Sequence, residues 1–191
     1  MKIATGFLKN RSLILPKKNS LRPTSAKVRA QVFDICQHYV EDASFLDLCA
    51  GCGAMGIEAI SRGAKKSTFV EKNSATAAIL RTNIQKLGIE KQCSLLTTDA
   101  VQAISLLARK GEPFSFVYID PPYEQQELLT SLIKAVDTLL PLENEARVVV
   151  EARKGIALPT SFSRLSLLSQ RSSGDTNLFV FVYKDVIFES L

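Results

Sequence analysis

The chain has 191 residues, which suits one α/β domain with a buried core and is short for two domains. Its composition, 46% hydrophobic and 23% charged, is ordinary for a soluble globular protein, and no apolar run approaches the ~18 residues that a membrane span needs. The four cysteines are scattered through apolar segments and the single histidine stands alone, so we expect neither a disulfide framework nor a metal site.

The N-terminal segment is basic. The first 33 residues carry eight Lys or Arg and no acidic residue, so the remainder sums to about −3 within a formal net charge of +5. This distribution favours polyanion binding over a merely solvated tail. We predict a basic β-hairpin, with strands at Ile3–Ala4 and Leu13–Leu15, as an extension over residues 1–20 ahead of a catalytic core over 21–191 in one domain. The early apolar run is too short for a secretory signal. The basic start could also be an organellar transit peptide, but we favour a cytoplasmic location.

A helix from about Ser25 to Tyr39 is followed by a buried strand, Phe45–Cys49. The strand runs into a glycine-rich turn that opens a helix over Ala54–Arg62. Gly51 and Gly53 allow the backbone to pass close to a ligand, and the helix N-terminus offers unpaired N–H groups. Such a turn fits NAD as well as S-adenosylmethionine, and it can also be no more than a tight connection.

Two acidic residues distinguish between these cofactors. Asp47 stands four residues before Gly51, where it would repel a pyrophosphate and attract the ammonium group of a methionine. Glu71 ends the next strand, Ser67–Val70, where its carboxylate can accept hydrogen bonds from two ribose hydroxyls. Both positions favour S-adenosylmethionine. Cys49 and Cys52 have a redox or zinc spacing, but no second ligand pair accompanies them.

The next helix is capped by Asn73 or Ser74 and ends at Gly88, and the third strand spans Ser94–Thr97. Sheet topology brings the end of this strand beside the same pocket. Asp99 could accept the adenine amino group there, with the Ala100 backbone N–H on a ring nitrogen. Asp99 could equally cap the following helix, and the two roles are compatible.

The fourth strand, Phe114–Ile119, leads into Asp120-Pro121-Pro122-Tyr123. The two prolines make a stiff, extended loop that cannot continue as a helix. An aryl amine is a poor nucleophile because its lone pair is delocalised into the ring. The Asp120 carboxylate and the Pro121 carbonyl can hold its two N–H groups and favour a pyramidal nitrogen. Tyr123 offers a face on which a base can stack, worth about 1–3 kcal/mol. The alternative is an ordinary strand-ending turn.

The last part of the chain predicts a different connection. A helix over about 125–140 precedes a strand at Arg147–Glu151, and the final strands, Arg164–Leu168 and Leu178–Tyr183, are joined by the turn Ser173–Asp175 without a helix. Two such strands form an antiparallel hairpin. We therefore predict an α/β fold whose seven-stranded, mostly parallel sheet ends in this hairpin, as is typical of Rossmann-like class I S-adenosylmethionine methyltransferases.

These motifs, in this order, resemble the amino-methyltransferases marked by an (Asp/Asn)-Pro-Pro-(Tyr/Phe) loop. The chain most resembles the bacterial 16S ribosomal RNA guanine-N2 methyltransferases, from about Gly6 to Tyr183. The matching positions of that family are Leu21-Arg22-Pro23-Thr24, Val28-Arg29, Phe33 and Gly174-Asp175-Thr176. The chain departs from the family at three positions: Asn10 replaces a usual Gly in the basic hairpin, Cys52 replaces a small polar residue, and Ser173 replaces an aromatic residue. The change at Ser173 weakens the case for the C-terminal loop as a substrate contact.

The resemblance implies methylation of the N2 amine of a guanine in 16S rRNA, within the small ribosomal subunit or its assembly intermediate, by a monomer that needs no metal. The implied catalytic residues are Asp120, Pro121, Pro122 and Tyr123, and the implied cofactor residues are Asp47, Gly51, Gly53, Glu71, Asp99 and Ala100. The candidate RNA contacts are Arg11, Lys17, Lys18, Arg22, Thr24, Lys27 and Arg29. A DNA adenine-N6 methyltransferase, a non-catalytic rRNA-binding assembly factor and an NAD-dependent oxidoreductase are the alternatives.

Overall fold

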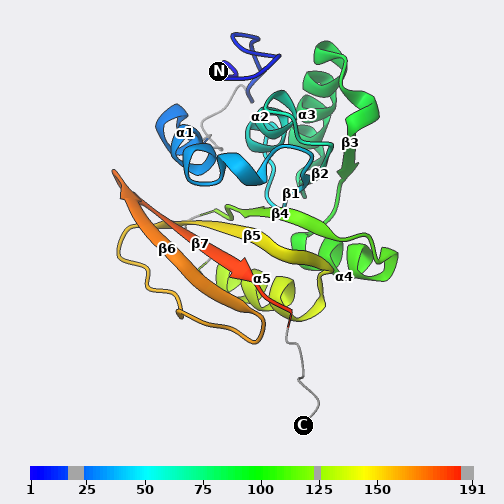
Figure 1. The fold of residues 1–191 in the computed structure, drawn as a ribbon. Helices are drawn as coiled ribbons and strands as arrows, with labels where there is room; N and C mark the ends of the chain where they lie inside the picture. Colours follow the sequence, from blue (N-terminus) through cyan, green and yellow to red (C-terminus); the bar gives the residue numbers. More distant parts are fainter. Residues whose placement is uncertain (17–23, 123–125, 186–191) are drawn as a thin grey trace.

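The computed structural model describes residues 1–16, 24–122 and 126–185 (Figure 1). Its centre is a seven-stranded sheet in the order β3-β2-β1-β4-β5-β7-β6. The strands are β1 (Ser44–Asp47), β2 (Lys66–Val70), β3 (Cys93–Leu96), β4 (Phe114–Ile119), β5 (Leu142–Arg153), β6 (Leu165–Ser173) and β7 (Thr176–Tyr183). Strands β1 to β5 pair in parallel, and β7 pairs antiparallel with β5 and β6. The predicted mostly parallel sheet and its closing hairpin are confirmed.

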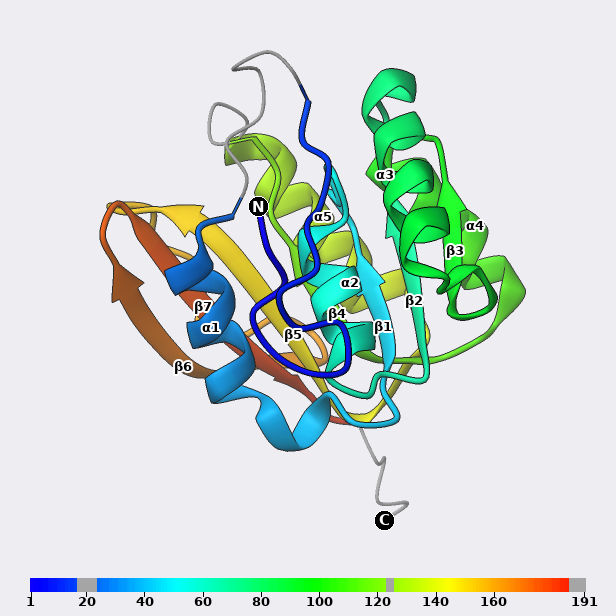
Figure 2. The ribbon, with the colours of Figure 1, turned by 90° about the horizontal axis from the view of Figure 1, so that it is seen from above.

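Helices cover both faces of this sheet. They are α1 (Ala26–Ile35), α2 (Ala54–Ser61), α3 (Ser74–Leu87), α4 (Ala100–Lys110) and α5 (Gln126–Leu139), with short 3₁₀ turns at Gln37–Tyr39 and Glu90–Gln92. The first three lie on one face and α4 and α5 on the other (Figures 1 and 2). Each face has its own hydrophobic core, as expected when helices pack on both sides of a parallel sheet.

Local sequence explains where several helices begin and end. Ser25 caps α1 by accepting from the Val28 N–H, and Asn73, rather than Ser74, caps α3 by accepting from the Thr76 N–H. Helix α3 ends at Gly88, whose φ of 70° is left-handed and therefore suits glycine. Each N-cap side chain thus satisfies an N–H group in the first turn of its helix.

Successive side chains along a strand point to opposite faces of the sheet, so they belong alternately to the two hydrophobic cores. Phe45, Phe116 and Tyr118 belong to the core beneath α1 and α2, whereas Val117 and Ile119 belong to the core over α4 and α5. The Phe45 and Phe116 rings stack with their centroids 4.8 Å apart. Polar residues that follow Tyr118 at the strand end therefore reach a pocket on the α1–α2 side.

The predicted N-terminal β-hairpin is wrong. Residues 1–16 form a looped segment with a single antiparallel bridge, between Lys2 and Ser12. The Phe7 N–H donates to the Ser61 carbonyl at the end of α2 instead of to a partner strand. Apolar side chains anchor the segment, namely Ile3, Leu8 and Leu13, which are all buried in the core beneath α1 and α2. Asn10 adopts a left-handed φ of 68°, a conformation that Asn tolerates better than most residues other than glycine.

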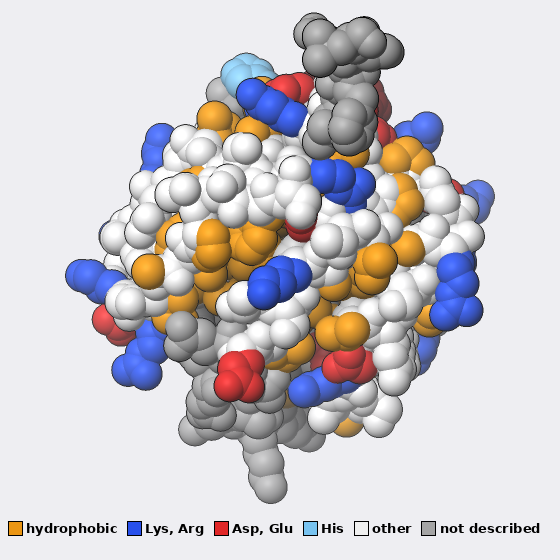
Figure 3. Space-filling view, turned by 90° about the horizontal axis from the view of Figure 1, so that it is seen from below, with side chains coloured by type: hydrophobic (Ala, Val, Ile, Leu, Met, Phe, Trp, Pro, Cys, Tyr) orange, Lys and Arg blue, Asp and Glu red, His pale blue; other side chains and the backbone are white. Residues whose placement is uncertain are grey.

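Figure 3 shows the face of the molecule over α4 and α5. Lys and Arg side chains lie around its margin and also nearer its centre, with hydrophobic groups between them. Among the described residues, no helix is both long enough and apolar enough to span a membrane.

Candidate active site

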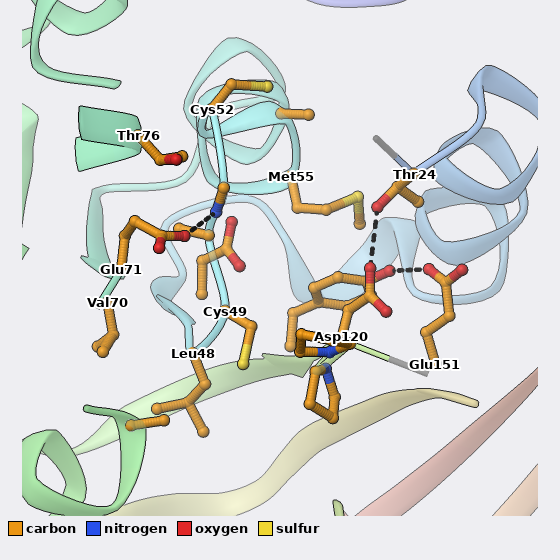
Figure 4. Close-up of a pocket in the computed structure, with 18 of the residues that line it drawn as sticks. Thr24, Leu48, Cys49, Cys52, Met55, Val70, Glu71, Thr76, Asp120 and Glu151 are labelled. Atoms are coloured by element: carbon orange, nitrogen blue, oxygen red, sulfur yellow. Dashed lines mark hydrogen bonds between the residues drawn. The ribbon is translucent and has the colours of Figure 1, made fainter. Parts of the chain in front are cut away.

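A cavity of about 930 Å³ opens at the carboxyl ends of the strands. Its walls come from the ends of β1, β2, β4 and β5, from the start of α1 and from the β6–β7 turn (Figure 4). This volume is at the upper end of the ~300–1,000 Å³ usual for ligand pockets. The lining includes six acidic residues, Asp47, Glu71, Asp99, Asp120, Glu151 and Asp175, against Lys27 and Lys72.

The turn between β1 and α2 forms one wall. Asp47 is 2% exposed, and its Oδ2 accepts from the Gly56 N–H at 3.2 Å. Burial, followed by the neighbouring Glu71 charge, raises the pKa of Asp47 to about 7. Gly51 has a φ of 54° and its missing side chain leaves open space, so a ligand can approach its backbone.

Gly53 has a different reason to be glycine. It does not line the cavity, and a Cβ at this position would lie 2.2 Å from the Leu80 side chain. Its φ of 89° also disfavours any other residue. Gly53 therefore permits α2 to pack closely against α3, while the space for a ligand lies at Gly51.

Glu71 links the ends of β1 and β2. Its Oε2 accepts from the Gly51 N–H at 2.9 Å, and its Oε1 accepts from the Asn73 N–H at 2.7 Å. Each carboxylate oxygen has a further lone pair, so the fixed carboxylate can still accept hydroxyl donors from a ligand.

Asp99 lies further along the same edge. Its Oδ1 caps α4 by accepting from the Val101 N–H at 2.9 Å, and both Asp99 and the buried Ala100 line the cavity. The capping role expected from the sequence is confirmed, and the residue's position in the cavity leaves the ligand role available.

The Asp-Pro-Pro loop follows β4. Asp120, Pro121 and Pro122 line the cavity, and Asp120 Oδ2 accepts from the Thr24 hydroxyl at 3.2 Å. Burial, then the charge of Glu151, raises the pKa of Asp120 well above its usual value, although the Thr24 hydrogen bond opposes this. Tyr123 lies outside the described residues.

Sequence reasoning missed Glu151, which stands near the end of β5 and is 4% exposed. Its Oε2 accepts from the Tyr118 hydroxyl at 2.5 Å, and its Oε1 accepts from the Thr176 hydroxyl at 3.4 Å. The position of Glu151 at the end of a parallel strand could have identified it. Glu71 and Asp99 were selected on that ground, because the carboxyl ends of parallel strands meet at one edge of the sheet.

The candidate RNA residues are separated in the structure. Arg11 is exposed, Lys27 is exposed at the cavity, and Thr24 contacts Asp120 inside it. Lys17, Lys18 and Arg22 lie outside the described residues.

The prediction for Arg29 is wrong. Its side chain is 3% exposed, its Nε lies 3.5 Å from Glu58 Oε2, and its guanidinium donates to the carbonyls of Lys2 and Thr24. The Arg29 guanidinium is therefore buried and bonded to other parts of the protein, so it is not accessible to an RNA phosphate.

The carboxylates of the cavity make it suited to binding a positively charged ligand. None of the salt bridges among the described residues includes Asp47, Glu71 or Asp120. Within the same residues, no group of three His, Cys, Asp or Glu could hold a metal ion. These buried carboxylates would be most stable opposite an organic cation or a set of N–H and O–H donors.

Known proteins are similar to this chain in sequence. The family model described as Conserved hypothetical protein 95 matches residues 1–182. Ribosomal RNA small subunit methyltransferase D of Escherichia coli is 33% identical over 91% of this chain and 85% of its own.

Solved structures show the same fold. The Escherichia coli protein yhhF superposes with a TM-score of 0.84 at 29% identity, covering 96% of this chain and 98% of its own. An O-methyltransferase from Bacillus cereus in complex with SAH (S-adenosylhomocysteine) gives 0.69 at 15% identity, over 89% of this chain and 84% of its own. At that identity the second likeness concerns the fold alone, which is the expected class I fold.

Proposed function

The chain belongs to the Conserved hypothetical protein 95 family, in agreement with the resemblance that its motifs carry, and from that premise we propose that it methylates 16S ribosomal RNA. The methyl donor is S-adenosylmethionine and the acceptor is the exocyclic N2 amine of a guanine. The observation that carries the proposal is the row of carboxylates along one cavity, with Asp120 and Pro121 among the groups that line it.

The residues present fit S-adenosylmethionine. This cofactor carries an ammonium group, a sulfonium, two ribose hydroxyls and an adenine amine. The cavity offers complementary hydrogen-bonding groups: the Asp47 carboxylate accepts from the ammonium, the Glu71 carboxylate accepts from the hydroxyls, and Asp99 with the Ala100 N–H pairs with the adenine. The open space at Gly51, where a Cβ would meet nothing within 4 Å, provides a cradle for the cofactor chain.

The bound cofactor supplies an activated methyl group on its sulfonium, so no metal is required. The protein's own contribution is to position the amine. Asp120 and the Pro121 carbonyl accept its two N–H groups, and the Asp120 carboxylate stabilises the positive charge that develops on nitrogen. Thr24 holds Asp120 in place by donating to Oδ2. Pro122 stiffens the loop, and Tyr123 supplies the stacking surface.

The candidate phosphate contacts for the RNA substrate are five basic residues. Arg11 and Lys27 are exposed, and together with Lys17, Lys18 and Arg22 they provide the phosphate contacts. The target base is flipped into the cavity to reach Asp120. We expect a cytoplasmic monomer that acts on the small subunit or its assembly intermediate. The name of the Escherichia coli relative assigns that protein to methylation of small-subunit ribosomal RNA.

The test is methyl transfer to defined acceptors. The protein is incubated with tritiated S-adenosylmethionine and, separately, unmethylated small-subunit particles, 16S rRNA and DNA. The proposal predicts label in the particle or rRNA and its recovery as N2-methylguanine after digestion. Label recovered as N6-methyladenine in DNA would support the DNA alternative, and RNA binding without any label would support an assembly factor.

A further inference from the structure

A second carboxylate lies beside the reacting one. In the sheet, β2, β1, β4 and β5 are successive neighbours, so Glu71, Asp120 and Glu151 follow one another along its edge. Glu151 is on the far side of Asp120 from Glu71 (Figure 4). If Glu71 belongs to the cofactor half of the cavity, Glu151 belongs to the half that receives the base.

Two hydroxyl donors fix the Glu151 carboxylate. Tyr118 donates to Oε2 at 2.5 Å and Thr176 donates to Oε1 at 3.4 Å. The side chain of Tyr118 is buried in the core under α1 and α2, and Thr176 begins β7 next to the cavity. The carboxylate is therefore held from two different elements and lines the cavity in a defined orientation. Such preorganisation is what selective recognition of a hydrogen-bond donor requires.

The bases differ in the pattern of hydrogen-bond donors and acceptors that their Watson–Crick edges would present to two carboxylates. Guanine presents its exocyclic N2 amine beside a ring N1–H, so both neighbouring groups are donors. Adenine and cytosine present their exocyclic amine beside a ring nitrogen that carries a lone pair, which a carboxylate would repel. Uracil has a ring N–H but no exocyclic amine. Only guanine can offer an amine to Asp120 and, next to it, a ring N–H to a second carboxylate.

We propose that Glu151 accepts a hydrogen bond from the N1–H of the target guanine and thereby selects guanine over adenine and cytosine. This inference rests on the proposed function and deepens it, because the Asp-Pro-Pro-Tyr loop by itself is compatible with several aminated bases. Asp120 holds the reacting amine, and Glu151 reads the identity of the base that carries it.

The electrostatics of the two carboxylates agree with this assignment. The charge of Glu151 contributes to the raised pKa of Asp120. A donor edge placed across both carboxylates would offset their mutual repulsion, whereas the lone pair of adenine N1 would increase it. The discrimination comes from replacing a hydrogen bond to the Glu151 carboxylate by the repulsion between that carboxylate and a ring lone pair.

The experiment compares two bases that share the reacting amine. Small-subunit RNA is prepared by ligation with guanine or 2-aminopurine at the position where tritium is incorporated, and is reassembled into particles. The base 2-aminopurine keeps the amine but has a lone pair at N1. Single-turnover methylation of both particles is measured for the wild type, for Glu151→Gln, and for Glu143→Gln as the matched control. Glu143 is an exposed residue near the opposite end of the same strand.

We expect the wild type and Glu143→Gln to prefer guanine about ten- to hundredfold, which is the effect of losing a hydrogen bond to a charged group. Glu151→Gln should slow methylation of guanine by a similar factor and reduce the preference towards unity, because a Gln amide can donate to the N1 of 2-aminopurine. Its affinity for S-adenosylmethionine should be unchanged.

Equal wild-type rates on guanine and 2-aminopurine would overturn the inference while leaving the proposed function intact. So would a guanine preference that persists in Glu151→Gln. Because the wild-type comparison needs no variant, a failure of Glu151→Gln to fold does not remove the test. No wild-type methylation of the guanine particle would contradict the proposed function itself, and with it the assignment of Glu151.

Discussion

Two polar clusters lie buried near the two ends of α2, and they are built on opposite principles. The arginine–glutamate cluster, Arg29, Glu58 and Arg62, lies at the carboxyl end of the helix. The carboxylate cluster, Asp47, Glu71 and Asp120, lies at its amino end beside the cavity.

Opposite charges face one another in the arginine–glutamate cluster. Glu58 is 1% exposed and lies 3.5 Å from Arg29 Nε and 3.1 Å from an Arg62 nitrogen. The Ala4 N–H also donates to Glu58, so the cluster ties the N-terminal segment to α1 and α2. Its hydrogen bonds are supplied by the protein itself, and we interpret it as a completed structural element.

The carboxylate cluster gathers like charges instead. Its members accept backbone N–H groups and one hydroxyl, and none of them takes part in a salt bridge among the described residues. Burial raises the pKa of both Asp47 and Asp120. The comparison teaches that the fold stabilises one cluster by itself, while the other is balanced only when a ligand brings positive charge and donors.

The largest expected effect falls on the arginine–glutamate cluster. Replacing Glu58 with Ala leaves the buried Arg29 guanidinium and the half-buried Arg62 guanidinium without their carboxylate. Breaking a buried pair in this way costs about 3–5 kcal/mol of unfolding free energy. Urea denaturation measures it. The matched control is Glu112→Ala, which removes the exposed pair that Glu112 makes with Lys66 at 2.6 Å and should leave the midpoint nearly unchanged. Equal midpoints for both variants would contradict the distinction.

Asp120→Ala should have the next largest effect, on rate rather than on stability. Removing one preorganised group that stabilises developing charge commonly costs about 10²–10³ in rate. Asp120→Asn should be slow but measurable, because it keeps an acceptor oxygen and loses the charge. Single-turnover methylation of small-subunit particles measures both variants. A near-normal rate for Asp120→Ala would remove Asp120 from the mechanism.

The pH dependence of stability provides the third test. The folded pKa of Asp47, about 7, lies above its unfolded value of 3.8, so its contribution to stability is present at low pH and is lost as pH rises towards 7. Between pH 5 and pH 7 the loss is roughly 2–3 kcal/mol. Without cofactor, Asp47→Asn should therefore lose less stability than the wild type over this range. If the unfolding free energies of the wild type and Asp47→Asn, measured by urea titration, changed equally with pH, the pKa of Asp47 would not be raised in the folded protein.

Glu71→Ala should have the smallest effect of the four. Losing hydrogen bonds to a charged acceptor costs about 1–3 kcal/mol, which weakens S-adenosylmethionine binding severalfold to a hundredfold. Because Glu71 also accepts from the Gly51 and Asn73 N–H groups, part of the loss reflects a looser turn. Calorimetry that gives the wild-type affinity would remove Glu71 from the cofactor site.

Most of the fold could be predicted because its signals are local. The glycine turn after β1, the caps at Asn73 and Asp99, and the helix-free connection to β7 each depend on a few adjacent residues. Strand ends then located Asp47, Glu71 and Asp120 at one edge, since parallel strands share that edge by topology.

The errors came from contacts between distant segments. Arg29 was interpreted as an RNA contact because its charge is visible in the sequence, whereas its pairing with Glu58 depends on how α1 packs against α2. The N-terminal segment looked like a basic extension, but Ile3 and Leu13 are buried in the core. Deleting this segment would therefore reduce stability as well as remove cations, so a truncation cannot test RNA binding alone.

If a cationic ligand balances the carboxylate cluster, binding of that ligand should release protons. Calorimetric binding of S-adenosylmethionine near pH 6, repeated in two buffers with different ionisation enthalpies, counts these protons. We expect net proton release from the wild type, because Asp47 is largely protonated below its pKa of about 7 and ionises opposite the ligand. The release should be smaller in Asp47→Asn. Absence of binding, or binding with the same proton count in both proteins, would show that a cationic ligand does not balance the cluster.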